Sequence, residues 1–176
     1  MEVMYDELLK NEGKTFVWAP FSPYPDHNLD TYKMMMEFES SVAGLSDGGA
    51  HCGLICDASM PTWNIAHYTR DRVKGDKIPL EFLIRKQTKE TAETFGLMDR
   101  GQIKEGYLAD INIIDHENLC VYKPEMVHDL PTGSRRIIQK AGGYIATIKS
   151  GVVTFKNDQA TGELPGTVLR GERTAE

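Results

Sequence analysis

The chain has 176 residues, of which 40% are hydrophobic and 26% charged, with a formal net charge of −6 and a pI near 5.4. This composition is ordinary for a folded globular protein, and the acidic balance argues against a nucleic-acid-binding protein, which usually presents a basic face. No apolar run approaches the roughly 18 residues of a membrane span. Three cysteines, an odd number, fit a reducing compartment better than a disulfide framework. We therefore expect a cytoplasmic protein that binds neither nucleic acid nor membrane.

The first half of the chain predicts helices that alternate with short strands. Met4, Leu8 and Leu9 share one face of an N-terminal helix, which Gly13 is placed to end. A second helix is expected over residues 29–40, with Met34, Met35 and Met36 in its core. Short apolar runs predict strands at residues 15–20 and 41–46.

Helices are expected to resume at residues 62–73 and 79–87, with Pro79 at the first position of the latter. Another short helix should follow, because Thr88 is a plausible N-cap and Gly96, followed by Leu97, a plausible C-terminal cap.

The sequence changes character near Gly101. Branched apolar residues predict a strand within residues 109–115, and residues 135–158 read as strands divided by glycine pairs or serine–glycine. The runs on either side of Ser150-Gly151 predict a hairpin with a two-residue turn. This change from a helix-and-strand pattern to a mostly strand pattern predicts two domains, residues 1–100 and residues 101–176.

Asp47 is the first candidate for chemistry. It follows the apolar run 41–46 and opens into two glycines, in the sequence "SDGG". A carboxylate at the C-terminal end of a buried strand is where an α/β barrel places catalytic groups, and glycines let a metal or a substrate approach the backbone. An Asp-Gly pair also makes ordinary turns.

The sequence resembles the C-terminal portion of the amidohydrolase superfamily, and within it the N-acyl-D-amino-acid deacylases, or D-aminoacylases. The resemblance is carried by five segments, of which the most specific part runs from Thr88 to Asp110. They are "GLSDGGAH" (44–51), "TRDR" (69–72), the run at 79–115, "PEMVHDLPTGSRR" (124–136) and "GVVTFKNDQATGELPG" (151–166).

This resemblance implies a fold and a reaction. Residues 1–100 would be the last βα units of a metal-dependent (β/α)8 barrel, with Asp47 at the tip of its eighth strand, followed by a small β-rich domain. Asp47 would act as general base on a metal-bound water, and possible direct contact with the metal is implied as well. Zinc or another divalent ion can bring bound water to a pKa of about 7, and a nearby carboxylate can move the proton.

The implied substrate is an N-acyl-D-amino acid, although superfamily members share a fold and differ in substrate. Another amide, a cyclic amide or a lactone therefore stays open. A full barrel takes about 250 residues, and no two of the five histidines (27, 51, 67, 116 and 128) form the His-x-His pair of the superfamily's metal site. We therefore expect a C-terminal fragment that is inactive alone and self-associates to cover the edges of the strand at 41–46. The alternative from another class is a non-catalytic, β-rich association domain.

The remaining candidates each have an ordinary alternative. His51 is a candidate substrate contact or a simple loop histidine. Arg70, with Arg72, could bind the carboxylate of an acylated amino acid, or lie on a solvated charged face. Cys52 and Cys56 lie near His51 but lack the paired four-ligand spacing of structural zinc, so buried, reduced thiols are expected. His67 is expected in packing and His128 in a structural loop.

Overall fold

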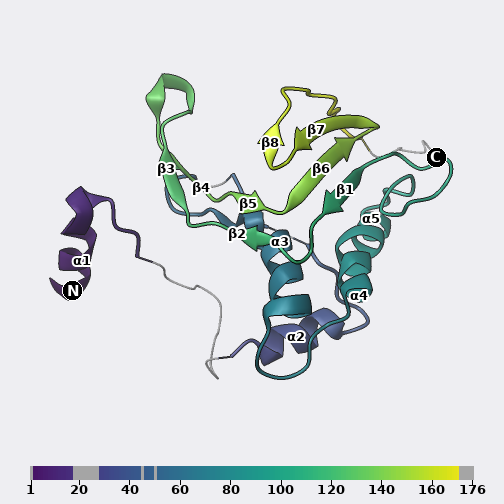
Figure 1. The fold of residues 1–176 in the computed structure, drawn as a ribbon, viewed down its shortest axis with the longest axis horizontal. Helices are drawn as coiled ribbons and strands as arrows, with labels where there is room; N and C mark the ends of the chain where they lie inside the picture. Colours follow the sequence, from purple (N-terminus) through teal and green to yellow (C-terminus); the bar gives the residue numbers. More distant parts are fainter. Residues whose placement is uncertain (1, 18–27, 45, 50, 171–176) are drawn as a thin grey trace, which may run out of the picture. The chain divides into compact units, whose positions relative to one another are not determined.

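The computed structural model describes residues 2–17, 28–44, 46–49 and 51–170. Its contacts divide the chain into two compact units, residues 1–32 and 33–176 (Figure 1). The first unit contains α1 (Glu2–Gly13), whose backbone leaves the helical conformation from Lys10 to Glu12 before Gly13 at φ +74°. The predicted N-terminal helix is therefore confirmed, but none of its residues is buried.

Two expectations for residues 28–49 are wrong. The helix predicted there is present as α2 (Asp30–Glu37), but Met34 is 65% exposed and no residue of α2 is buried, so the three methionines do not form a core. Residues 41–44 and 46 belong to no strand. Of the strand predicted at 15–20, residues 15–17 are not in a strand and the rest lies outside the described residues.

The middle of the chain forms two helical rods in the second unit. After η1 (Asp57–Ser59), α3 (Met60–Ile65) continues into the π-helix η2 (Ala66–Asp71). The second rod runs through α4 (Leu80–Arg85), the π-helix η3 (Lys86–Glu90) and α5 (Thr91–Thr94). Both predicted helices are confirmed, with Pro79 one residue earlier than expected, at the N-cap.

The second rod is continuous where a break was expected. Thr88 is not an N-cap: it lies inside η3 and its Oγ1 donates to Ile84 O at 2.8 Å, four residues back. The C-terminal cap is confirmed, because Gly96 has φ +72° and its N–H donates to Glu93 O at 3.0 Å, while Leu97 N donates to Ala92 O at 2.8 Å. This is the paired hydrogen-bond pattern of a Schellman cap.

Residues beyond Gly101 form antiparallel strands, as expected. One sheet has the order β1-β6-β7-β8, and two further pairs are β2-β5 and β3-β4 (Figure 1). The strands are β1 (Ile111–Ile114), β2 (Cys120–Val121), β3 (Glu125–Val127), β4 (Arg136–Ile138), β5 (Ala141–Gly142), β6 (Tyr144–Lys149), β7 (Val152–Lys156) and β8 (Gln159–Ala160), with the short 3-10 helix η4 (Pro131–Gly133) between β3 and β4. The predicted hairpin is confirmed: Lys149 faces Val152 across a two-residue turn in which Ser150 and Gly151 both have positive φ.

The described residues contain no parallel strand pair, whereas a (β/α)8 barrel is built from parallel strands. The barrel remnant predicted for residues 1–100 is therefore not seen as strands. The physical reason is pairing: a central barrel strand bonds its N–H and C=O groups to neighbours on both sides. Residues 41–44 have no such strand neighbours among the described parts of this chain, and the carbonyls of Ser41 and Ala43 are bound by side chains instead.

Helices and strands pack together within the second unit. The largest buried side chains are Tyr68, Ile78, Leu83 and Leu119, which come from η2, the loop after it, α4 and the loop after β1. Thr62 Oγ1 and Tyr144 Oη lie 2.6 Å apart, which joins α3 to β6. The domain boundary near residue 101 stays a prediction. Among the described residues, no helix has the length and apolar character to cross a membrane.

Candidate functional site

Asp47 lies in the loop between α2 and η1, half-buried, with φ at +25°. Its neighbour Gly48 allows a close contact, because a Cβ at that position would lie 2.9 Å from Cβ of Ala58. Asp47 therefore belongs to a loop that packs on η1 through Gly48. The described residues do not form the strand at whose tip Asp47 was expected. Its role as general base or metal contact stays a prediction.

The loop after Asp47 is anchored to the strands. His51 is exposed, has φ at +46°, and its carbonyl accepts hydrogen bonds from Leu54 N at 2.7 Å and Ile55 N at 3.0 Å, which closes a tight turn. Cys52 O accepts a hydrogen bond from Ile137 N of β4 at 2.7 Å. Contact between His51 and a substrate also stays a prediction.

The cysteines belong to no metal-binding cluster among the described residues. All three thiols are free, and each is half-buried where full burial was expected. Burial, followed by the charge of Asp57, raises the pKa of Cys56, so this group stays a protonated thiol at neutral pH. No group of three or more His, Cys, Asp or Glu side chains that could hold a metal ion occurs in the part of the chain that the structure describes.

Arg70 joins the helix η2 to the loop after β1. Its Nη1 donates to His116 O and, at 2.9 Å, to Glu117 O, and its Nη2 donates to Leu119 O at 2.8 Å. The remaining donors bind Asp71 at 2.6 and 2.8 Å and lower the pKa of that carboxyl. All five donors of the guanidinium are thus used within the chain. This geometry does not support Arg70 as a carboxylate-binding residue.

The other candidates on this helix serve packing. Arg72 is only 6% exposed and its guanidinium lies 5.8 Å from the centre of the Tyr68 ring, so the alternative of a solvated charged face is wrong for it. His67 stacks on Trp63 at 4.5 Å, which agrees with the packing role expected for it. Burial, assisted by the charge of Arg72, lowers the pKa of His67, so it is neutral at pH 7.

Two more histidines are used in structural contacts, and His27 lies outside the described residues. His116 Nε2 lies 2.7 Å from Thr69 Oγ1. This hydrogen bond joins η2 to the loop after β1, as the bonds of Arg70 do. His128 Nδ1 lies 3.2 Å from Gly133 O in the connection between β3 and β4, as expected for a loop residue.

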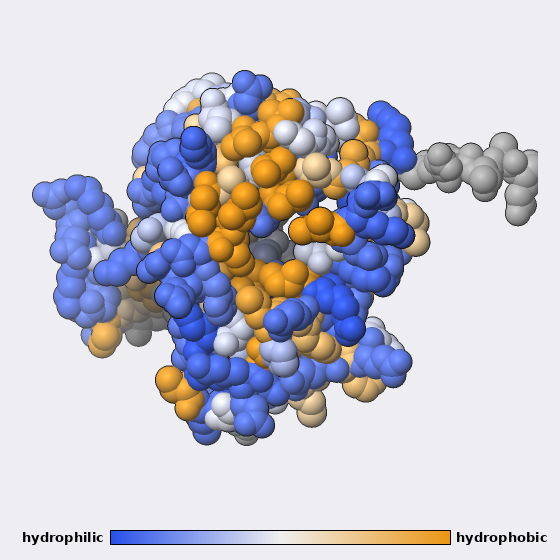
Figure 2. Space-filling view, turned by 45° about the vertical axis from the view of Figure 1, so that its right-hand side comes forward, coloured by the Kyte–Doolittle hydropathy of each residue, from blue (hydrophilic) through white to orange (hydrophobic). Residues whose placement is uncertain are grey.

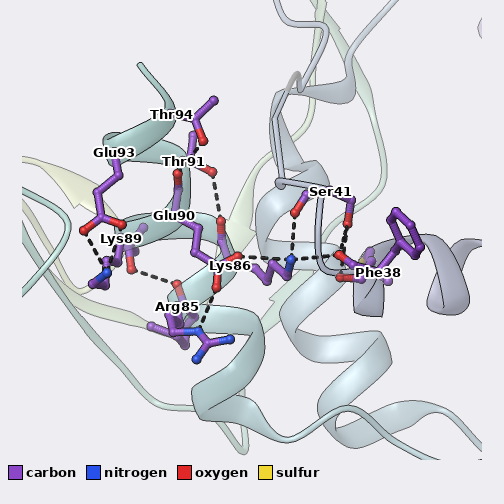
Figure 3. Close-up of polar contacts among 12 residues, drawn as sticks. Phe38, Ser41, Arg85, Lys86, Lys89, Glu90, Thr91, Glu93 and Thr94 are labelled. Atoms are coloured by element: carbon purple, nitrogen blue, oxygen red, sulfur yellow. Dashed lines mark hydrogen bonds and ion pairs between the residues drawn. The ribbon is translucent and has the colours of Figure 1, made fainter. Parts of the chain in front are cut away.

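Lys86 is the residue that sequence reasoning missed. It is 3% exposed, and its Nζ donates to Ser41 O at 2.7 Å and Phe38 O at 3.1 Å while pairing with Glu90 Oε2 at 3.0 Å (Figure 3). Its only sequence signal is a glutamate four residues later, a spacing that more often marks an exposed helix pair. The segment that leads into Asp47 is thus held by a buried ammonium group.

Comparisons with known proteins give the family. The description "Amidohydrolase family" matches residues 17–155, and the chain therefore belongs to the amidohydrolase family. Over 105 residues, or 60% of the chain, it is 33% identical to a D-aminoacylase of Alcaligenes xylosoxydans xylosoxydans. That match covers 19% of the relative, so the chain spans about a fifth of the curated protein it matches. No solved structure matches the chain.

This membership confirms the resemblance found in the sequence. Amidohydrolases generally bind divalent metal ions. The described residues of this chain do not fit such an ion by themselves, because Asp47 has no cluster of further His, Cys, Asp or Glu ligands around it there.

Proposed function

We propose that this chain belongs to a hydrolase that cleaves the amide bond of N-acyl-D-amino acids, with Asp47 as its general base. The observation that carries the proposal is the family match, which spans Asp47 and its loop. The likeness to a D-aminoacylase supports this choice of substrate, and His51 is proposed as a substrate contact. Asp47 accepts a proton from the attacking water and returns it to the leaving amine.

Apart from the contact predicted for Asp47, the metal ligands of this proposal lie outside the described residues. A divalent ion such as zinc would supply the acidity of the attacking water. We expect the 176-residue chain to be inactive alone, because its described residues do not form a metal site.

Replacing Asp47 with asparagine tests the proposal, because the amide keeps the shape of the side chain and cannot take up the proton. The variant is made in a polypeptide that joins these 176 residues to a complete amidohydrolase metal site. We expect kcat to fall by about 10²- to 10⁴-fold, the usual contribution of a general base. We measure kcat from the release of free amine, with a panel of N-acyl-D-amino acids, their L-enantiomers and cyclic amides as substrates.

The matched control is Asp57→Asn, which removes an exposed carboxylate from η1, ten residues further along, and should leave kcat unchanged. An Asp47→Asn enzyme with the original rate would exclude the general-base role. Robust turnover by the 176-residue chain with added zinc would show that it carries more of the site than we propose.

A second candidate function, association through apolar surface, is favoured by a separate observation. Figure 2 shows a broad band of apolar residues on one face, and the described residues include large side chains left almost bare, such as Val73 at 99% and Ile103 at 89% exposure. Monomeric proteins rarely expose large contiguous apolar patches. The strand edges expected at 41–46 do not explain such association, because residues 41–44 and 46 belong to no strand.

We therefore predict that the isolated chain forms dimers or larger species as its concentration rises. Size-exclusion chromatography with light scattering measures the mass across a concentration series. A constant mass of one chain, 19.8 kDa, at the highest concentration would contradict the prediction.

A further inference from the structure

The rod from Leu80 to Thr94 binds three carbonyl groups of the segment that leads into Asp47. Lys86 Nζ donates to the carbonyls of Phe38 and Ser41 (Figure 3). Thr91 Oγ1 lies within hydrogen-bond distance of two carbonyls, at 2.8 Å from Lys86 O of its own rod and at 2.5 Å from Ala43 O. Ala43 lies four residues before Asp47, a stretch that spans at most about 14 Å when extended. The last bond therefore lies close to the carboxylate along the chain.

The buried Lys86 ammonium depends on this segment for two of its hydrogen-bond acceptors. Burying an ammonium is costly unless its charge is paired and its protons are bonded. Lys86 has three donors, and three acceptors surround it: Phe38 O, Ser41 O and Glu90 Oε2. If the segment moved away, two of the three would be lost at a side chain that is 4% exposed.

Capping of α2 alone does not explain these contacts. Ser41 Oγ already donates to Met35 O and Phe38 O at the end of that helix, where a cation is also favourable. The bond from Thr91 reaches Ala43, six residues beyond the last residue of α2, where no helix carbonyl remains to be capped. Its effect is to tie the loop itself to the rod.

The loop is fixed beyond Asp47 as well. Gly48 packs on Ala58, and Cys52 O is bonded to Ile137 N of β4 at 2.7 Å. Asp47 thus lies between an anchor at residues 38–43 and another at residues 48–52. In an active site, misplacing a group by about 1 Å can cost about 10²-fold in rate.

We propose that Lys86 and Thr91 are positioning residues for Asp47, which hold residues 38–43 against the rod and so fix where the carboxylate lies. This inference rests on the role of Asp47 proposed above. Neither side chain touches the reacting atoms; both act through the backbone of the loop.

The test uses the 176-residue chain first and measures backbone order parameters of residues 42–44 by NMR relaxation. Thr91→Val removes the hydroxyl that binds Ala43, and we expect the order parameters there to fall from about 0.85 to below about 0.6. Thr91→Ser keeps the hydroxyl and should restore them. The matched control is Thr94→Val, since Thr94 Oγ1 donates to Glu90 O of its own rod, at 2.7 Å, and to no other group among the described residues.

Lys86→Met should give the same local loss, with Lys89→Met as its control, because Lys89 pairs with Glu93 on the exposed face of the rod at 2.7 Å. Unchanged order parameters at 42–44 in both Thr91→Val and Lys86→Met would overturn the inference. An equal fall throughout β6 and β7 would overturn it too, since that would mean general destabilisation.

A kinetic readout links the anchor to Asp47. In the active polypeptide that carries the complete metal site, Thr91→Val should lower kcat about tenfold with KM unchanged, while Thr94→Val leaves both as they were. If Asp47→Asn is inactive and Thr91→Val has normal kcat, the inference fails and the proposed function stands. If Asp47→Asn keeps its rate, the proposed function fails, the positioning role fails with it, and the order parameters still report the mechanical anchor.

Discussion

Replacing Arg70 with methionine is expected to lower the free energy of unfolding by about 3 kcal/mol. The three carbonyls that its guanidinium binds, at His116, Glu117 and Leu119, would lose charged donors, each typically worth about 1.5–3 kcal/mol. Three such bonds would together be worth about 4.5–9 kcal/mol, and we expect less than this sum because the Arg70 side chain is 26% exposed and water can replace part of the loss. Methionine preserves the apolar stem, so the change reports on the hydrogen bonds.

Urea unfolding at a low protein concentration measures the effect, with Arg136→Met as the matched control. Arg136 binds Asp129 through two hydrogen bonds, at 2.7 and 2.6 Å, but both side chains are largely exposed. An exposed ion pair of this kind contributes little to stability. Equal losses in the two variants would refute the view that Arg70 anchors the loop after β1 to the helix.

The parts of the fold that sequence predicted correctly depend on local chemistry. The turn at Ser150-Gly151 and the cap at Gly96 require backbone conformations with positive φ, and in both a glycine marks the position. Strand β1 follows from a short run of branched apolar residues. Each of these signals is complete within a few residues, so no distant part of the chain is needed to read it.

The predictions of a strand at 41–46 and of a helix break at Thr88 were wrong because they depend on residues far along the chain. An apolar run becomes a strand only when neighbours bind its backbone, and the described residues bring a helix beside it. A threonine caps the start of a helix only where its own backbone lies outside the helical conformation, and Thr88 lies inside an unbroken rod. The outcome in both cases is decided by residues beyond the local window.

The candidate site divides in the same way. Five sequence segments, most specifically the one from Thr88 to Asp110, indicated the family, which the comparison confirms. It did not distinguish arginines and lysines that bind carbonyls from those that face water, because the partners lie far along the chain: 49 residues separate Arg70 from Leu119, and 45 separate Lys86 from Ser41. Helical periodicity contains no information about such pairs.

Replacing Gly143 with alanine is expected to cost about 4 kcal/mol in the free energy of unfolding. Gly143 has φ at +97°, and a Cβ there would lie 2.7 Å from the Cα and 2.9 Å from the N of Leu119, a fully buried residue. A positive φ costs an L-residue about 1–2 kcal/mol, and overpacking typically adds about 1–3 kcal/mol. The clash involves backbone atoms, which cannot rotate away as a side chain could.

Gly151→Ala separates the two costs. Gly151 has a similar φ of +82°, and nothing lies within 4 Å of the position that its Cβ would take, so only the conformational cost of about 1–2 kcal/mol is expected. Urea unfolding of both variants measures the difference between their free energies of unfolding. Equal losses would mean that Leu119 can shift away from the new Cβ without a loss of stability. Because Arg70 also holds Leu119, through its carbonyl, the double variant Arg70→Met/Gly143→Ala should lose less than the two single losses combined, as expected for residues that share a partner. Strictly additive losses would mean that Arg70 and the contact of Gly143 with Leu119 stabilise this loop independently.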